Sequence, residues 1–117
     1  MNTSTDTPGK TTVSTDVLIS IGRLTALSVP GVNRLANGVR DFNRIFSKPE
    51  DEGVLVEVLD GRVYMDLFVI LERDLNVRDV SRKIQSQVDR AISEMVGMEV
   101  GRINIHVEDI DFKSKEA

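Results

Sequence analysis

Alternating apolar and polar positions are clearest in the middle of the chain. Residues 54–59 alternate Val-Leu-Val-Glu-Val-Leu, and Asp60-Gly61 comes directly after them. An Asp-Gly pair supplies the positive φ angles of a two-residue type I′ turn, and such a turn fixes the strand register. The pattern therefore predicts a β-hairpin with six apolar residues on one face: Val58 opposite Val63, Val56 opposite Met65, and Val54 opposite Leu67.

Helical spacing of apolar residues marks two further segments. The first predicted helix covers residues 16–28, with Ser14 or Thr15 as N-cap and with Pro30 just beyond its end. The second runs from an Asn76 cap to Gly97, which suits the left-handed position after a helix. Its apolar stripe consists of Val77, Val80, Ile84, Val88, Ala91, Ile92 and Met95. A last strand is predicted over residues 100–110.

The first helix is apolar on more than one side, because Ile19 and Ala26 widen its stripe. Two interpretations remain: burial on several sides within the monomer, which we favour, or contact of one side with a partner. Gly22 inside this helix costs about 1 kcal/mol relative to alanine, so we expect a reason for it such as close approach of a neighbouring backbone.

The order helix-strand-strand-helix-strand predicts an α+β fold with a three-stranded sheet and both long helices packed on one face. The third strand should run parallel to the second, while its neighbour in the sheet is left open. Residues 32–52 are interpreted as a linker with irregular apolar turns or a short helix. Residues 1–15 form a Thr/Ser-rich tail expected to be disordered, residues 16–112 a single domain, and residues 113–117 a frayed C-terminus.

The composition excludes several kinds of chemistry. There is no cysteine and only one histidine, so disulfides, thiolate nucleophiles and sites with two imidazoles are excluded. With 15 Lys and Arg against 19 Asp and Glu, the net charge of −4 disfavours general nucleic-acid binding. No run approaches the roughly 20 apolar residues of a membrane span, and the N-terminus lacks the apolar core of a secretory signal. We expect a cytoplasmic protein without direct membrane insertion.

Candidate chemistry is sparse. His106 is expected on the same sheet face as Asp66 and Glu108, and a carboxylate-paired imidazole could act as a general base. No motif supplies a nucleophile beside it, so a surface histidine is favoured. The acidic runs at 50–52 and 108–111 lack the pattern of a calcium loop. We therefore expect no catalytic residue, no cofactor and no metal site.

A nucleic-acid role is the alternative. The order of elements invites comparison with KH domains, but the GXXG loop of that module is absent. Arg34, Arg40 and Arg44 could form a local basic patch, although such a group is usually just a solvated face. A small KH-like nucleic-acid-binding or regulatory module is kept as the second hypothesis.

Four segments in the same order carry a resemblance to a known family. They are the VPGV element at 29–32 with Gly38 beyond it, the hairpin segment 53–67, the helix bearing Val80, Ile84, Gln85, Val88 and Ala91, and the sequences MVGMEV at 95–100 and INIHV at 103–107. Over about residues 17–112 the chain resembles the alkaline shock protein family, also called envelope stress response proteins, found mainly in Gram-positive bacteria.

The resemblance implies a non-enzymatic cytoplasmic protein that associates with itself and, through a membrane-anchored partner, with the inner face of the cell membrane. It carries no catalytic motif. The face of the sheet turned away from the helices offers a candidate interaction patch: Tyr64, Phe68, Ile70, Ile110 and Phe112. Such a face is normally polar, so its apolar half is either an interface or is covered by residues 32–47. The self-association of the family favours the interface.

Overall fold

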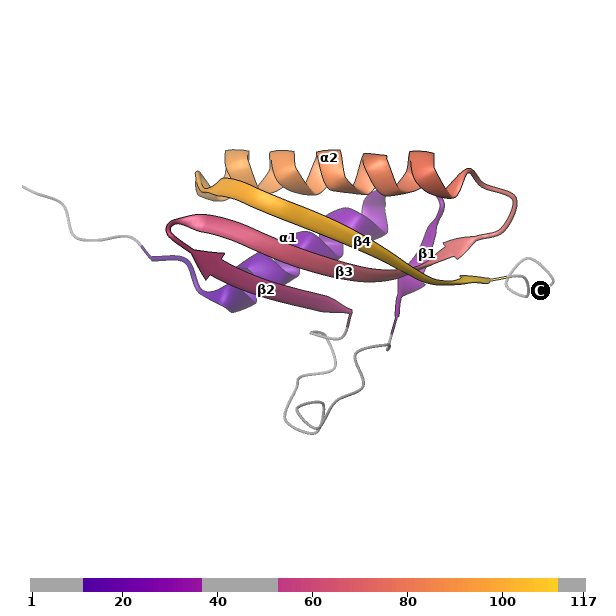
Figure 1. The fold of residues 1–117 in the computed structure, drawn as a ribbon, viewed down its shortest axis with the longest axis horizontal. Helices are drawn as coiled ribbons and strands as arrows, with labels where there is room; N and C mark the ends of the chain where they lie inside the picture. Colours follow the sequence, from indigo (N-terminus) through magenta and orange to yellow (C-terminus); the bar gives the residue numbers. More distant parts are fainter. Residues whose placement is uncertain (1–11, 37–52, 112–117) are drawn as a thin grey trace, which may run out of the picture.

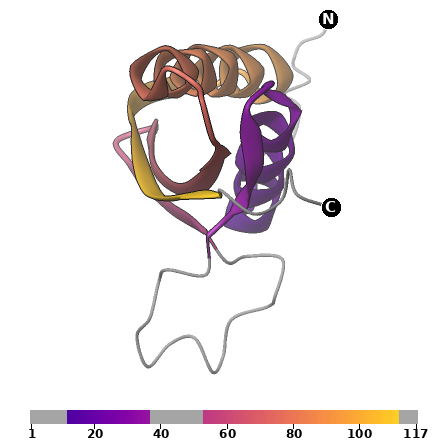
Figure 2. The ribbon, with the colours of Figure 1, turned by 90° about the vertical axis from the view of Figure 1, so that its right-hand side faces the viewer.

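Two helices and a four-stranded sheet form the part of the chain, residues 12–36 and 53–111, that the computed structural model describes. The elements are α1 (Thr15–Ser28), β1 (Val32–Leu35), β2 (Val54–Leu59), β3 (Arg62–Glu72), α2 (Val77–Val96) and β4 (Glu99–Asp111). The sheet curves around both helices, which pack against its concave face and against each other (Figures 1 and 2). This confirms the α+β class and the placement of the two helices.

β3 is the central strand of the sheet. β2 pairs with its first half in antiparallel fashion, in the register expected from the two-residue turn. Asp60 and Gly61 have φ angles of 51° and 77°, so both residues have the positive φ that a type I′ turn requires. β4 runs parallel to β3 along its whole length. The parallel orientation was expected, and the structure places this strand beside β3.

The expected three-stranded sheet is wrong by one strand, because β1 joins it. β2 pairs only with residues 62–67 of β3, and β1 pairs with residues 69–71 along the same edge. The change occurs at Phe68, whose N–H donates to Gly53 O at 2.8 Å and whose carbonyl accepts from Ala36 N at 2.7 Å. The four residues of β1 are too few to show an alternation of apolar and polar side chains, so the sequence pattern did not distinguish this strand from the linker that follows it. The rest of that linker, residues 37–52, lies outside the described residues.

Both helices begin and end at the residues that the sequence indicates. Ser14 accepts a hydrogen bond from Val17 N at 3.3 Å, and Asn76 accepts one from Asp79 N at 3.0 Å. Gly97 ends α2 in the left-handed conformation with φ of 71°. Val13 packs against the core just before α1, so part of the stretch expected as tail is held by the domain. The remaining tail residues, 1–11, and residues 112–117 lie outside the described part.

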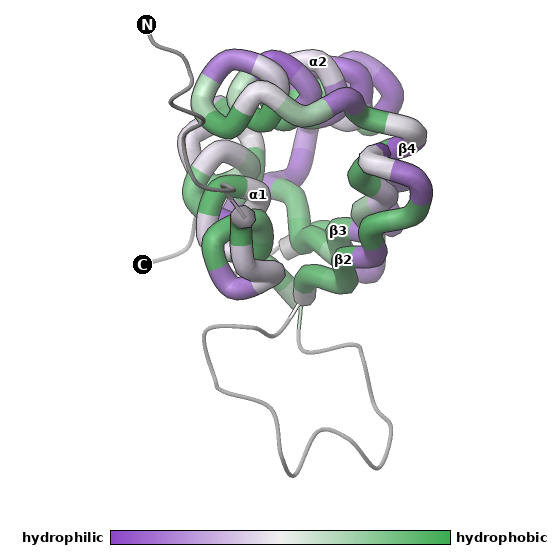
Figure 3. The backbone as a smooth tube through the Cα atoms, turned by 90° about the vertical axis from the view of Figure 1, so that its left-hand side faces the viewer, coloured by the Kyte–Doolittle hydropathy of each residue, from purple (hydrophilic) through white to green (hydrophobic). Residues whose placement is uncertain are grey.

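The core lies between the concave face of the sheet and the two helices. Met65, Leu67, Ile84 and Ile92 are among its fully buried side chains. Figure 3 shows hydrophobic residues running along β2 and β3 and hydrophilic ones on the outer side of α2. Every second residue of β3 is buried, because side chains alternate between the faces of a strand.

α1 is buried on one side only, so the expected burial on several sides is wrong. Leu18 and Ala26 are fully buried, whereas Leu24 on the other side is 58% exposed. Gly22 faces the core, and a Cβ built there would lie 2.5 Å from the Met65 sulfur. The close neighbour of Gly22 is therefore a side chain of β3, where a backbone was expected.

Candidate interaction surface

The sheet face turned away from the helices, here called the outer face, carries the other half of the β3 side chains. Tyr64, Asp66, Phe68 and Ile70 are partly exposed and alternate with buried residues. Leu55 of β2 lies beside Asp66 in the register and is 46% exposed. An aliphatic, an aromatic and a carboxylate side chain therefore share one unpartnered surface of the described domain.

A polar cluster occupies the middle of the outer face. Asp66 Oδ1 accepts a hydrogen bond from Asn104 Nδ2 at 3.1 Å and lies 2.8 Å from His106 Nε2. The His106 ring also stacks on Phe68, with the ring centroids 4.5 Å apart and an interplanar angle of 13°. The parallel register explains both contacts, because Asn104 is the neighbour of Asp66, and His106 that of Phe68. Two polar side chains of β4 are thus fixed by two residues of β3.

This cluster fulfils the expectation that His106 and Asp66 share a face, but it does not assemble a nucleophilic site. In residues 12–36 and 53–111, the side-chain partner of His106 Nε2 is Asp66, and no serine or threonine hydroxyl hydrogen-bonds to the ring. The His106 side chain is 42% exposed. Its contacts are those of a surface histidine held by a carboxylate and an aromatic ring.

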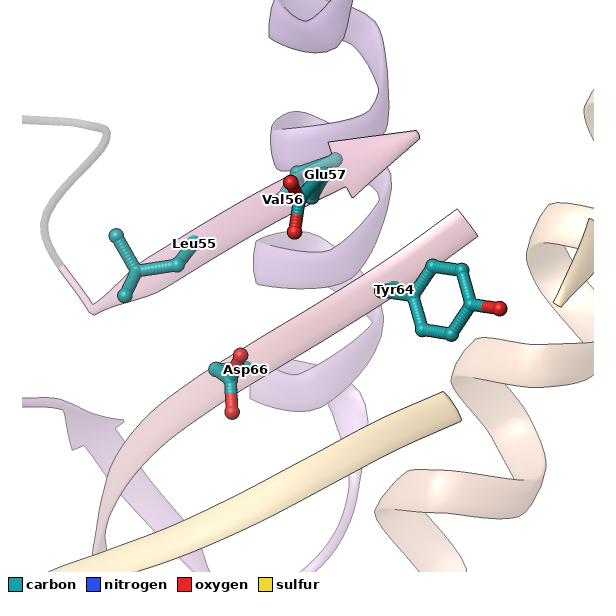
Figure 4. A pocket seen from close by; sticks show the side chains of 5 residues that line it. All are labelled: Leu55, Val56, Glu57, Tyr64 and Asp66. Atoms are coloured by element: carbon teal, nitrogen blue, oxygen red, sulfur yellow. The ribbon is translucent and has the colours of Figure 1, made fainter. Parts of the chain in front are cut away.

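The first half of the outer face is hollowed between β2 and β3. An open depression of about 370 Å³ is lined by Leu55, Val56, Glu57, Tyr64 and Asp66. Figure 4 shows Leu55 and Glu57 on β2 beside Tyr64 and Asp66 on β3. Its lining combines aliphatic groups with two carboxylates, so it favours contact with an apolar side chain or a cation over contact with a phosphate.

The Tyr64 ring lies over Gly101 in β4. A Cβ built at Gly101 would come within 2.6 Å of two Tyr64 ring carbons, so only glycine leaves room for the ring in this position. The register of β4 shifts at this point, since Val63 pairs with Val100 but Tyr64 pairs with Arg102. The extra residue is a β-bulge, and an aromatic ring packed over a glycine helps to hold such a register.

A second bulge changes the predicted patch. Val107 pairs with Val69, but the next pair is Asp109 with Ile70, so Glu108 is the extra residue. Ile110 therefore lies beside the buried Leu71, on the helix side of the sheet. The expectation that Ile110 shares the outer face with Tyr64, Phe68 and Ile70 is wrong, because it assumed uninterrupted alternation along β4. Phe112 lies outside the described residues.

Of the three arginines of the predicted basic patch, the structure describes one. Arg34 lies in β1 as the neighbour of Ile70 and donates through Nη1 to Asn33 Oδ1 at 2.9 Å, while Arg40 and Arg44 are outside the described residues. Within the described ranges, no three acidic or histidine side chains are grouped closely enough to hold a metal ion. The helices of these same ranges include none that is long and apolar enough to cross a membrane.

Leu55 and Leu59 are apolar residues of the outer face that the predicted patch omitted. They are 46% and 50% exposed and lie opposite Asp66 and Arg62 in the hairpin. The signal that could have found them was present, because the register of a two-residue turn already places both on the face away from the core.

Comparison with solved structures shows the same fold in proteins of distant sequence. A MamM CTD structure superimposes with a TM-score of 0.53 at 11% identity, covering 85% of this chain and 100% of that chain. Another MamM CTD structure gives a TM-score of 0.51 at 13% identity, covering 81% and 96%.

Two relatives are similar along nearly the whole chain. Uncharacterized protein Spy1535 of Streptococcus pyogenes serotype M6 is 32% identical over 109 residues, which is 92% of this chain and 83% of the relative. Uncharacterized protein YqhY of Bacillus subtilis strain 168 is 24% identical over 111 residues, or 92% of this chain and 81% of the relative. The model of a protein family that is described as having a cell envelope-related function matches residues 3–112 of this chain. The chain therefore belongs to the alkaline shock protein family, with its cell envelope-related function.

Proposed function

We propose that the protein is a non-enzymatic structural or scaffolding component of the cell-envelope stress response. It acts by self-association and by binding a membrane-anchored partner, which would keep it at the inner face of the cell membrane. The observation that carries this proposal is the outer face, where Leu55, Tyr64, Phe68 and Ile70 leave a partly apolar sheet surface without a covering layer in the described domain. Surfaces of this composition are typical of protein contacts.

The contacts within the outer face support a binding role. Asn104 and His106 are held by Asp66, and His106 is also held by Phe68, so their side chains are ordered before any partner arrives. Preordered side chains lose less conformational entropy on association. The polar cluster adds hydrogen-bonding groups to an otherwise apolar surface. In a protein interface, the apolar residues contribute affinity and the hydrogen bonds fix the orientation of the partner.

Replacing Phe68 by glutamate tests the outer face. The substitution places a carboxylate beside Asp66 and removes the aromatic ring under His106, so it should oppose any docking on this surface. Light scattering over a concentration series should show a rising average mass for the unmodified protein and smaller assemblies for Phe68→Glu. Gln87→Glu on the exposed side of α2 adds the same charge elsewhere and should behave as the unmodified protein. A strict monomer at high concentration, unaltered by Phe68→Glu, would contradict self-association.

His106→Ala separates a binding role from a catalytic one. Losing the hydrogen bond to Asp66 and the stacked ring should cost about 1 kcal/mol of unfolding free energy, because both contacts are partly exposed. Because Leu55, Tyr64, Phe68 and Ile70 remain on the outer face, we expect a cell carrying this variant to lose only part of its response to envelope stress, measured as survival beside a deletion strain. A deletion-like phenotype, with the variant folded and its assemblies of normal size, would favour chemistry at His106.

A further inference from the structure

The depression between β2 and β3 presents two carboxylates. Glu57 is exposed, and in residues 12–36 and 53–111 no cationic side chain pairs with it. Asp66 lies diagonally across from Glu57, because Tyr64 is the register partner of Glu57 and Asp66 follows two residues later. Diagonal residues on one face of an antiparallel pair are about 7–8 Å apart, which is within reach of one long side chain. A single group that enters the depression can therefore meet both carboxylates.

Asp66 keeps one oxygen for such a contact. Asn104 Nδ2 and His106 Nε2 both lie against Oδ1 of Asp66, at 3.1 Å and 2.8 Å. In the part of the chain that the structure describes, Oδ2 makes no hydrogen bond. An ionised carboxylate accepts hydrogen bonds on both of its oxygens. Asp66 can therefore hold the polar cluster of the outer face and bind a further donor at the same time.

The other lining residues fit the stem of a long cationic side chain. Leu55 is 46% exposed and is the register partner of Asp66, while Tyr64 is that of Glu57 (Figure 4). The methylene stem of an arginine packs on such apolar surface, and the guanidinium at its end is attracted to the face of an aromatic ring. Arg102 pairs with Tyr64 from the β4 side and does not line the depression. The place of a cation there is not taken by Arg102.

We propose that the depression receives an arginine side chain of the membrane-anchored partner, with its guanidinium between Glu57 and Asp66 and its stem against Leu55. Charge complementarity selects this occupant. An apolar side chain would remove water from two carboxylates without pairing them, which costs free energy, and an anionic group would be repelled by both. A guanidinium has five N–H donors in a planar fork, so it can donate to both carboxylates at once.

This inference rests on the proposed function, because it states what the outer face recognises in the partner. Segments on the cytoplasmic side of a membrane span are rich in arginine and lysine, so a membrane-anchored partner offers the required side chain next to its span. A second copy of this chain is less suited to the depression. With 19 Asp and Glu against 15 Lys and Arg, the copy brings a net charge of −4 toward two carboxylates.

Titration with a short peptide tests the arginine site. The probe is acetyl-Leu-Arg-Leu-amide, added to the full isotope-labelled chain and followed by NMR. The same peptide with citrulline in place of arginine is the control, because citrulline has nearly the same shape and no charge. We expect the arginine peptide to shift the amide resonances of Leu55, Glu57 and Asp66 and to bind about tenfold more tightly than the citrulline peptide. Equal affinities, no binding of either peptide, or shifts confined to other residues would overturn the proposal.

A pair of charge reversals supplies the second measurement. Glu57→Lys should weaken binding of the arginine peptide at least about tenfold, because it places a like charge at the site. Glu94→Lys makes the same change in net charge on α2, which covers the opposite face of the sheet (Figure 2). At about 0.15 M ionic strength, charges are screened beyond about 8 Å, so this control should change the affinity less than about twofold.

Asp66 is left unchanged in these variants, since Asn104 and His106 depend on it for their positions. Thermal unfolding of each variant checks that the fold is kept. Equal losses of affinity in Glu57→Lys and Glu94→Lys would mean that the peptide responds to net charge alone, and would overturn the proposed site.

The arginine site and the proposed function can fail separately. Binding of the arginine peptide that depends on Glu57, with assembly unaltered by Phe68→Glu, would support the arginine site and contradict self-association through the outer face. Assembly that is lost with Phe68→Glu, with equal affinities for the arginine and citrulline peptides, would overturn the arginine site and leave the proposed function intact.

Discussion

Gly53→Ala should destabilise the protein by about 3 kcal/mol of unfolding free energy, through two costs that act together. Gly53 has φ of +87°, a conformation that costs an L-residue about 1–2 kcal/mol. A Cβ at this position would also lie 2.8 Å from the Leu35 Cβ and 3.0 Å from the Ala36 carbonyl oxygen. Forcing extra atoms into a packed site costs about 1–3 kcal/mol. Denaturant unfolding of the two proteins measures the sum.

Gly97→Ala is the matched control for this prediction. Gly97 has φ of +71°, but a Cβ there would meet nothing within 4 Å. The control should therefore lose only the conformational part, about 1–2 kcal/mol. Equal losses for the two variants would mean that the junction of β1, β2 and Phe68 yields easily, contrary to the close packing around Gly53.

Leu67→Ala should cost about 2–5 kcal/mol of unfolding free energy, the range for a buried leucine truncated to alanine. Leu67 is fully buried at the centre of the sheet, and the structure around it can close the resulting cavity only in part. A domain of this size typically unfolds with a total of about 5–15 kcal/mol, so the variant should be close to unfolding at moderate temperature. Chemical denaturation at fixed temperature measures the difference.

The hairpin itself offers the control. Leu59 is a leucine in the paired strand, but it lies on the outer face and is 50% exposed. Leu59→Ala should change the unfolding free energy by less than about 0.5 kcal/mol when measured on the monomer at low protein concentration. If Leu59→Ala proved the more damaging of the two, the register of β2 and β3 would have to be shifted by one residue.

The hairpin and α2 were predictable because their signals are local. A two-residue Asp-Gly turn leaves one register, and an Asn cap, a 3.6-residue stripe and a glycine at the end define a helix without help from the rest of the chain. β1 was not predictable in this way. Its four residues form a strand because the second half of β3 would otherwise expose an unpaired edge, and that need arises elsewhere in the sequence.

The candidate site divides along the same line. The alternation of β3 was enough to place Tyr64, Phe68 and Ile70 on one face. The bulges at Gly101 and Glu108 depend on how β4 fits beside β3. The pattern of apolar and polar residues along β4 therefore did not indicate that Ile110 lies on the opposite face. The contacts of His106 with Asp66 and Phe68 join residues 40 and 38 positions apart, and only the parallel register brings them together.

By itself, the sequence determined the α+β class, the hairpin register, the ends of both helices and the membership of a family with a cell envelope-related function. The tertiary structure alone decided the fourth strand, the face on which Ile110 lies, and which side of α1 remains exposed. The physical reason is that turns, caps and periodicity act between residues close in the chain. The pairing of a strand edge, the position of a bulge and the burial of a side chain depend instead on which segment, distant in the sequence, packs against those residues.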